Sequence, residues 1–146
     1  MSVKKCFFIG HRDTPETVYP SLLEAVRKHI AEYGVTQFIV GRYGAFDKLA
    51  AKAVIEAKKE YQEVSLSLLL PYHPSERVFE VPDGFDDTIY PEGMERVPHR
   101  YAIIRANRYM VDNVDYIIAY AWQPGSNAIR LIEYANRKKR FVMNLA

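Results

Sequence analysis

The sequence predicts an α/β fold in which helices cover both faces of a mostly parallel sheet. Short apolar runs alternate along the chain with longer segments whose apolar residues recur at helical spacing. Three of the apolar runs end in a glycine-containing turn that precedes a helical segment, at residues 10–12, 41–44 and 124–127. Backbone amides at a helix start and the helix dipole both favour a bound anion, so this order of strand, turn and helix predicts a small anionic ligand, above all a nucleotide.

The first half of the chain predicts three strands and two helices. Strands are expected at residues 4–9, 36–40 and 64–70, with helices between them over 18–33 and 46–61. Pro20 requires that the first helix start near Tyr19 or begin with an irregular turn. Leucine and serine alternate in the third strand, so we expect that strand to be less fully covered than the first two.

The second half begins with an irregular segment. Proline, glycine and acidic residues interrupt every pattern between residues 71 and 98, which predicts a functional loop, a mobile loop or a short helix. After it, helices are expected at 101–113 and 127–137, and strands at 114–122 and 141–145.

The connections between these elements predict the order of the strands. Right-handed crossovers place the second and third strands on one side of the first and the other two on the opposite side, giving a five-stranded sheet in the order 3-2-1-4-5. The expected architecture is a Rossmann-like, three-layer α/β/α fold, with one nucleotide-binding domain over residues 1–146. Ligands in such sheets bind beyond the carboxyl ends of the strands, where the order reverses. The turns at 10–12 and 124–127 meet there, with 41–47 beside them.

Composition excludes several classes of protein. The chain has 20 basic and 18 acidic residues, and a net charge of +2 argues against nucleic acid as a partner. One cysteine excludes an internal disulfide framework, and the four histidines show no metal-ligand spacing. With no signal peptide and no apolar stretch of about 20 residues that could cross a bilayer, we expect a soluble cytoplasmic protein without a membrane partner.

The first two turns supply most of the candidate ligand-binding residues. Gly10 lets the chain turn and lets a ligand approach the backbone. Arg12 can pair with a phosphate through two N–H groups, and His11 can donate a hydrogen bond or act as an acid or base. In the second turn, Gly41 and Gly44 can direct backbone amides toward a ligand.

The remaining polar candidates lie near helix starts. Asp47 either interacts favourably with the dipole of its helix or accepts a hydrogen bond from a ribose hydroxyl or an amine. Gly125 permits an unusual backbone angle, and Ser126 or Asn127 can cap the last helix or hold a phosphate.

Four residues outside the turns are also singled out. Tyr72 follows the third strand and can stack on a base. Asn107 and Arg108 lie on the third helix but face about 100° apart, so only one of the two is expected to reach a given ligand. His29 lies on the inward face of the first helix and is expected to be a satisfied core histidine rather than a ligand.

Four segments together resemble the SLOG superfamily, named after the Smf/DprA and Lonely Guy proteins, and within it the YpsA-like branch. The segments are residues 6–12 (CFFIGHR), 41–47 (GRYGAFD), 107–112 (NRYMVD) and 122–127 (WQPGSN). The resemblance implies a Rossmann-like domain that binds nucleotides or nucleotide-derived ligands, and it implies a homo-oligomer. Members with enzymatic activity cleave the N-glycosidic bond of nucleoside monophosphates, others are proposed sensors, and some bind single-stranded DNA.

The chain departs from the catalytic Lonely Guy type at one motif. That type carries PGGxGTxxE, whereas residues 124–133 here read PGSNAIRLIE and lack the second and third glycines. Glu133 also comes one residue late, which rotates it by about 100° around the helix. The departure argues against phosphoribohydrolase activity.

Three functions follow. We expect a sensor or regulatory protein that binds a nucleoside phosphate, ADP-ribose or an NAD derivative at the C-terminal edge of the sheet, with no other cofactor implied. The alternative is a nucleotide N-glycosidase, for which Asp47, Glu133 and His11 are the catalytic candidates because a departing base must be protonated near a carboxylate. The third is a binding module for single-stranded DNA or a protein partner, for which the 11 tyrosines supply stacking surfaces.

Overall fold

Six strands and four α-helices alternate along the chain in a computed structural model that describes residues 3–75 and 81–146. The strands are β1 (Lys4–Gly10), β2 (Val35–Val40), β3 (Ser65–Leu69), β4 (Asp87–Ile89), β5 (Tyr116–Tyr120) and β6 (Phe141–Asn144). The α-helices are α1 (Tyr19–Tyr33), α2 (Ala45–Lys58), α3 (Ala102–Asn113) and α4 (Asn127–Arg137). Short 3-10 turns are η1 (Glu16–Val18), η2 (Met94–Arg96) and η3 (His99–Tyr101). Among the described residues, no helix has both the length and the apolar character needed to span a membrane.

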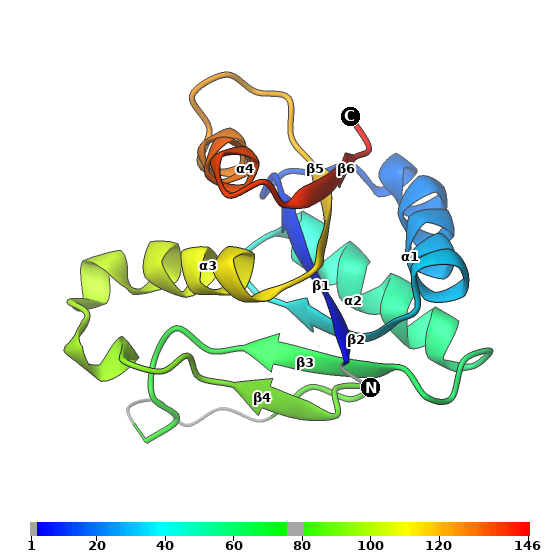
Figure 1. Ribbon diagram of the computed structural model, residues 1–146, viewed down its shortest axis with the longest axis horizontal. Coiled ribbons are helices and arrows are strands. Elements are labelled where there is room, and N and C mark those ends of the chain that lie inside the picture. The colour runs from blue at the N-terminus through cyan, green and yellow to red at the C-terminus, as the bar shows by residue number, and fades with distance from the viewer. Residues whose placement is uncertain (1–2, 76–80) are drawn as a thin grey trace.

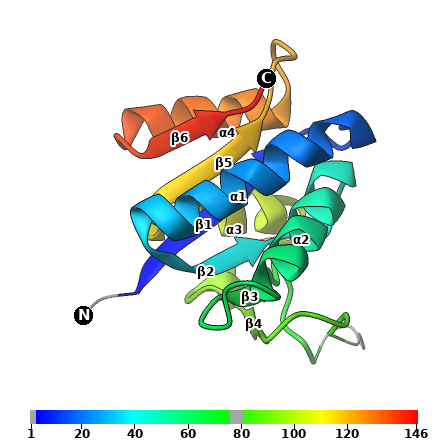
Figure 2. The same cartoon turned by 90° about the vertical axis from the view of Figure 1, so that its right-hand side faces the viewer.

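The strands form one parallel sheet between two helical layers. The order is β4-β3-β2-β1-β5-β6, with β1 in the interior (Figure 1). Helices α1 and α2 cover one face and α3 and α4 the other, as Figure 2 shows from a second direction. Alternate residues of β1 therefore enter different cores: Phe8 packs on the α1–α2 side, and Phe7 and Ile9 pack on the α3–α4 side. This is the Rossmann-like α/β arrangement that the sequence predicts.

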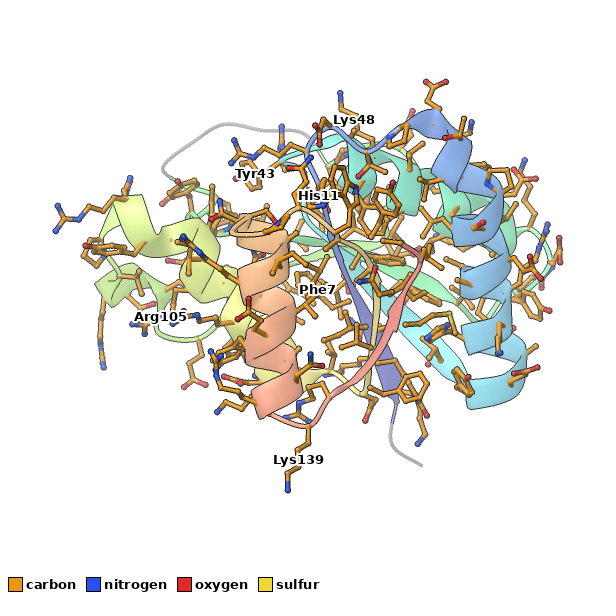
Figure 3. The ribbon with its side chains drawn as sticks, turned by 90° about the horizontal axis from the view of Figure 1, so that it is seen from above. Phe7, His11, Tyr43, Lys48, Arg105 and Lys139 are labelled. Carbon is orange, nitrogen blue, oxygen red and sulfur yellow. The ribbon has the colours of Figure 1, made fainter. Side chains whose placement is uncertain are left out.

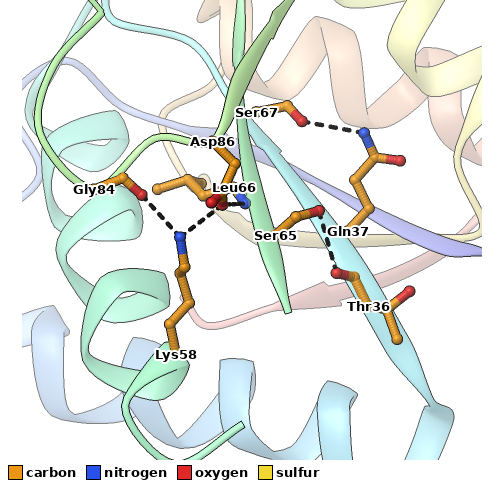
Figure 4. Close-up of polar contacts among 8 residues, drawn as sticks. All are labelled: Thr36, Gln37, Lys58, Ser65, Leu66, Ser67, Gly84 and Asp86. Carbon is orange, nitrogen blue, oxygen red and sulfur yellow. Dashed lines mark hydrogen bonds and ion pairs between the residues drawn. The ribbon is translucent and has the colours of Figure 1, made fainter. Parts of the chain in front are cut away.

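The sheet has one strand more than expected. Strand β4 pairs with β3 at the edge, so the predicted count of five and the order 3-2-1-4-5 are both wrong by this strand, while the five predicted strands keep their relative positions. Its pairing is fixed by Asp86, whose amide donates to Leu66 O and whose carboxylate accepts from Leu66 N, both at 2.8 Å. Lys58 Nζ lies 2.6 Å from the same carboxylate and 3.0 Å from Gly84 O (Figure 4).

Strand β3 is fully covered, in contrast to the expectation from its sequence. Residues 66–69 are all buried, because helices cover both faces of the sheet here and β4 extends it beyond β3. Ser67 is 0% exposed, and its hydroxyl accepts a hydrogen bond from the Gln37 side chain at 3.1 Å. The alternation of leucine and serine therefore reflects a satisfied polar group inside the core and not a solvent-facing surface.

Helix α1 begins and ends where its proline and glycine predict. It starts at Tyr19, directly after η1, and Pro20 lies in its first turn, where a missing N–H leaves no helical bond unmade. Gly34 ends the helix with a φ of 71°, and its amide donates to Ile30 O at 3.2 Å. This left-handed residue lets β2 begin at the next position.

Candidate functional site

A cleft of about 630 Å³ opens beyond the carboxyl ends of the central strands. Its walls come from the β1–α1, β2–α2 and β5–α4 loops and from helices α3 and α4. The candidate residues that line it are Gly10, His11, Arg12, Gly41, Gly44, Asp47, Asn107, Arg108, Ser126 and Asn127. The cleft lies at the reversal of strand order, where the topology of an open α/β sheet places ligands. His11 and Tyr43, both in its lining, are labelled in Figure 3.

His11 joins two of the loops that form the cleft. Its side chain is 5% exposed, and Nε2 accepts hydrogen bonds from Trp122 N at 2.9 Å and Gln123 N at 3.3 Å. Its own amide donates to Tyr120 O at 3.3 Å. Two N–H donors at Nε2 require a lone pair there, so the ring proton resides on Nδ1. Nε2 therefore has no proton to give to a leaving group, and the residue holds the β1–α1 loop against the β5–α4 loop.

Gly10 and Gly44 provide room for protein atoms, where the sequence suggests room for a ligand. A Cβ on Gly10 would lie 2.1 Å from the Phe46 ring, and a Cβ on Gly44 would lie 2.7 Å from Arg12 Cα. The close packing brings the first amides of α2 to backbone carbonyls: Ala45 N donates to Arg12 O at 2.9 Å, and Phe46 N donates to His11 O at 3.4 Å. The amides of Ala45 and Phe46 at the start of α2 thus already have acceptors within the protein.

The start of α4 is open to the cleft. Gly125 adopts a φ of 74°, which only glycine adopts readily, and it brings the chain into the helix without lining the cleft itself. Ser126 caps α4, its hydroxyl accepting from Ile129 N at 3.2 Å. The amides of Asn127 and Ala128 have no partner among the described residues, and both residues line the cleft. These free N–H groups at the positive end of a helix form an anion-binding position.

The cleft also holds three arginines. Arg12 from the β1–α1 loop, Arg108 from α3 and Arg130 from α4 all line the cleft. Within the described part of the chain, none of their guanidinium groups has a carboxylate within 4.0 Å. The guanidinium of Arg108 lies 5.1 Å from the centre of the Tyr134 ring, a cation–π distance. Among the described residues, the three arginines of the cleft therefore form no ion pair, although Asp13 and Asp47 also line it.

Sequence reasoning missed Arg130 and the apolar wall. Arg130 lies one helical turn after Ser126, so its spacing from the glycine turn was the available signal. Ile103, Ile104 and Leu131 line the cleft opposite the loops. Ile104 is 48% exposed, so the apolar wall is open to a bound group. Asn107 and Arg108 both line the cleft, and the expectation that only one of them reaches a given ligand stays a prediction.

Asp47 is the carboxylate at the base of the β2–α2 loop. Its Oδ2 accepts a hydrogen bond from Tyr43 N at 3.1 Å. Burial raises the pKa of Asp47 to about 6, and the hydrogen bond from Tyr43 lowers it by a smaller amount. No lysine or arginine among the described residues lies within 4.0 Å of it. A titrating carboxylate without a cation therefore lines the same cleft as the three arginines.

Besides Gly125, two candidate residues lie away from the cleft lining. The Tyr72 hydroxyl donates to His99 O at 3.5 Å and its ring packs on the His99 ring, while Pro71 takes its place in the lining. Glu133 is exposed on α4, nearly one turn further along the helix than Arg130, and lies outside the lining. Among the described residues, no group of three or more histidine, cysteine or acidic side chains could hold a metal ion.

Comparison with known proteins shows the fold. No protein-family model matches the chain, and no curated protein sequence matches it. DNA processing protein A from Streptococcus pneumoniae matches with a TM-score of 0.69 and 15% identity over 97% of this chain, which spans 50% of that protein. The same protein from Helicobacter pylori, solved for its single-stranded DNA binding mode, matches with a TM-score of 0.65 and 14% identity over 97% of this chain and 64% of that chain. The molybdenum cofactor carrier protein of Chlamydomonas reinhardtii matches with a TM-score of 0.61 and 19% identity over 97% of this chain and 76% of that chain. At these identities, the likeness shows that the chain shares the Rossmann-like α/β fold of these proteins.

Proposed function

We propose that the chain is a SLOG-superfamily protein of the YpsA-like branch that binds a nucleotide or nucleotide-derived ligand in the cleft, as a sensor or regulatory protein. The observation that carries the proposal is that one cleft is lined by the start of α4, whose first amides are free, and by three arginines without a carboxylate partner among the described residues. The fold likeness to proteins that handle single-stranded DNA and a molybdenum cofactor supports it. Nucleoside phosphates, ADP-ribose and NAD derivatives are the ligand classes to test.

The cleft matches both halves of a nucleotide. Asn127 N and Ala128 N offer backbone donors to a phosphate, and Arg12 and Arg130 offer charged donors beside them. Ile103, Ile104 and Leu131 offer apolar surface to the base. A volume of about 630 Å³ lies within the range of sites that enclose a molecule of nucleotide size.

Calorimetry with a panel of nucleotides tests this proposal. We expect AMP, GMP, ADP-ribose or NAD to bind with a dissociation constant below 1 mM, and Arg130→Gln to weaken binding about tenfold or more, because it removes a charge-assisted hydrogen bond of about 1.5–3 kcal/mol. Lys139→Gln, beyond the C-terminal end of α4, is the matched control and should bind as the wild type does. The absence of binding for every nucleotide, or equal losses in both variants, would refute the proposal.

Single-stranded DNA is a second candidate ligand, which the likeness to the Helicobacter pylori protein favours. Arg108 also lines a second cavity of about 630 Å³ that includes Arg96 and Arg105 together with Glu92 and Asp112, so arginines continue beyond the first cleft, interspersed with two carboxylates. The net charge of +2 thus conceals a local cluster, and composition alone does not argue against a nucleic acid. Fluorescence anisotropy with labelled oligonucleotides discriminates the two candidates. A DNA ligand binds more tightly as the strand lengthens, and Arg105→Gln weakens it, whereas a mononucleotide ligand is insensitive to Arg105.

N-glycosidase activity is a third candidate, and the position of Asp47 favours it. Among the three proposed catalytic residues, only Asp47 brings a carboxylate into the cleft, and its raised pKa suits proton transfer near neutral pH. Release of free base from a nucleoside monophosphate is the assay. If turnover is found, Asp47→Asn should abolish it and Glu133→Gln should leave it unchanged.

We also propose that the protein is a homo-oligomer, which sedimentation velocity would test.

A further inference from the structure

The structural role of Asp47 explains why an acceptor is present at this position but not why the acceptor is a carboxylate. Its Oδ2 accepts from Tyr43 N at 3.1 Å, which pins the β2–α2 turn to the first turn of α2. Oδ1 makes no hydrogen bond to any described residue. An amide or a serine would accept the same backbone hydrogen bond without the cost of a largely desolvated charge. The ionisable group is therefore better explained by what it meets in the cleft.

Gly41 keeps the space next to this carboxylate open. A Cβ at position 41 would lie 3.1 Å from Asp47 Oδ2, tighter than an ordinary contact. Gly41 is not among the glycines with a positive φ, so its backbone does not require glycine. The missing side chain therefore leaves room beside the Asp47 carboxylate, and both residues line the cleft.

The charges of the cleft divide its ligand into two parts. Arg12, Arg130 and the start of α4 favour an anion, whereas a carboxylate repels one. Asp47 is thus suited to an uncharged group that donates hydrogen bonds. In a nucleotide, the ribose hydroxyls are such donors, and they lie between the phosphate and the base.

We propose that Asp47 accepts a hydrogen bond from the ribose 2′-hydroxyl and is the residue that selects ribonucleotides over 2′-deoxyribonucleotides. The proposal rests on the nucleotide-binding function above and adds the sugar class that the site prefers. With the deoxy ligand, the half-buried Asp47 carboxylate is left without a donor. The preference therefore comes from this loss as well as from the hydrogen bond gained with the ribonucleotide.

Matched pairs of ligands test the assignment. Calorimetry compares AMP with dAMP and GMP with dGMP on the wild type, Asp47→Asn and Asp47→Ala. Asparagine keeps an acceptor for Tyr43 N, so the turn stays intact in Asp47→Asn. Any change in sugar preference in this variant is then due to the lost carboxylate. We expect the wild type to prefer the ribonucleotide about tenfold and both variants to reduce this preference to within about twofold, while the deoxynucleotides bind the variants as tightly as the wild type or more tightly.

The controls distinguish a failure of the Asp47 assignment from a failure of nucleotide binding itself. Glu63→Gln removes an exposed carboxylate at the opposite end of the sheet and should leave the preference unchanged. Equal binding of AMP and dAMP to the wild type overturns the assignment of Asp47 and leaves nucleotide binding intact. No binding of any of the four nucleotides overturns both. A parallel loss of ribo- and deoxyribonucleotide affinity in Asp47→Asn shows that the residue only shapes the cleft, and this too overturns the assignment.

Discussion

His11 holds two loops of the cleft together through one ring nitrogen. Nε2 receives the amides of Trp122 and Gln123, which lie at the end of the chain segment that leads into α4. His11, which the sequence offers as an acid or base, thus acts as an acceptor that joins the β1–α1 loop to the β5–α4 loop. Whether a polar residue in a turn binds a ligand or holds the turn together can be decided only from its hydrogen-bond partners.

Replacement of His11 should loosen both loops. We expect His11→Ala to lower the free energy of unfolding by about 2 kcal/mol, because two backbone amides lose their acceptor. His11→Gln, which retains an acceptor, should lose less. Urea unfolding measures the difference, and His73→Ala, at an exposed position, is the control. Unchanged stability in His11→Ala would contradict the bridging role.

Asp47 should make stability depend on pH in a distinctive direction. Its pKa is raised from 3.8 to about 6 by burial, so the folded state binds the proton more tightly than the unfolded chain does. The ionised carboxylate therefore costs stability above pH 6, and this cost disappears as the pH falls from 6 to 4. We expect Asp47→Asn to be more stable than the wild type at pH 7.5 by about 1–2 kcal/mol, and equal to it near pH 4. Thermal unfolding at both pH values decides; a difference independent of pH would exclude the raised pKa.

At the scale of elements, the packing of α1 on β5 encloses a histidine with one unsatisfied nitrogen. His29 is 0% exposed, and its Nδ1 lies 2.7 Å from Ala25 O, to which it donates. Nε2 has no partner, and the ring meets Tyr33 and Tyr116 edge-on. The expectation of a satisfied core histidine is therefore right for one nitrogen and wrong for the other.

This packing should weaken in acid. Burial lowers the pKa of His29, the hydrogen bond to Ala25 opposes that shift, and Lys28 adds to it. The unfolded chain therefore takes up the proton first as the pH falls below 6.5, and stability falls with it by up to about 1.4 kcal/mol per pH unit. His29→Leu should remove this dependence. Denaturant unfolding of both proteins between pH 7.5 and 5 tests it, and parallel curves would contradict it. The effect has the opposite sign to that of Asp47.

For the whole molecule, charge distribution matters more than net charge. The chain carries only +2, yet Arg12, Arg108 and Arg130 converge on one cleft while its lysine–carboxylate pairs lie elsewhere. Salt screens exposed charges of this kind. We expect an increase from 50 to 500 mM NaCl to weaken nucleotide binding roughly fivefold and to leave the binding of an uncharged nucleoside unchanged. Equal salt dependence for the nucleotide and the nucleoside would show that the arginines do not contact the phosphate.

Elements with local signals could be predicted, and elements with distant partners could not. Helix α4 has the predicted bounds 127–137 because Gly125, Ser126 and the apolar spacing are all near neighbours in sequence. Strand β4 has only three residues, and its position depends on Asp86 reaching Leu66, twenty residues away. A strand of three residues is too short to show the alternation of apolar and polar residues that predicts a strand. The cover of β3 was misjudged for the same reason, since β4 extends the sheet beyond it.

The location of the candidate site could also be predicted from the sequence, whereas the roles of its residues could not. Residue types in the three turns predicted the cleft, because strand order follows from connectivity and the carboxyl ends of parallel strands share one edge. The role of each residue did not follow. Gly10 makes room for Phe46, and Tyr72 packs on His99. The charged residue of α4 in the lining is Arg130 and not Glu133.

The sequence by itself determined the alternation of strands and helices, the cover of both sheet faces by helices and the edge at which the turns meet, because these depend on apolar spacing, on turn residues and on the handedness of crossovers. The tertiary structure alone decided which amides stay free, which carboxylate stands in the cleft and which arginines surround it. Those features depend on atoms that come within a few ångströms of one another from distant parts of the chain, and no spacing along the sequence encodes that distance.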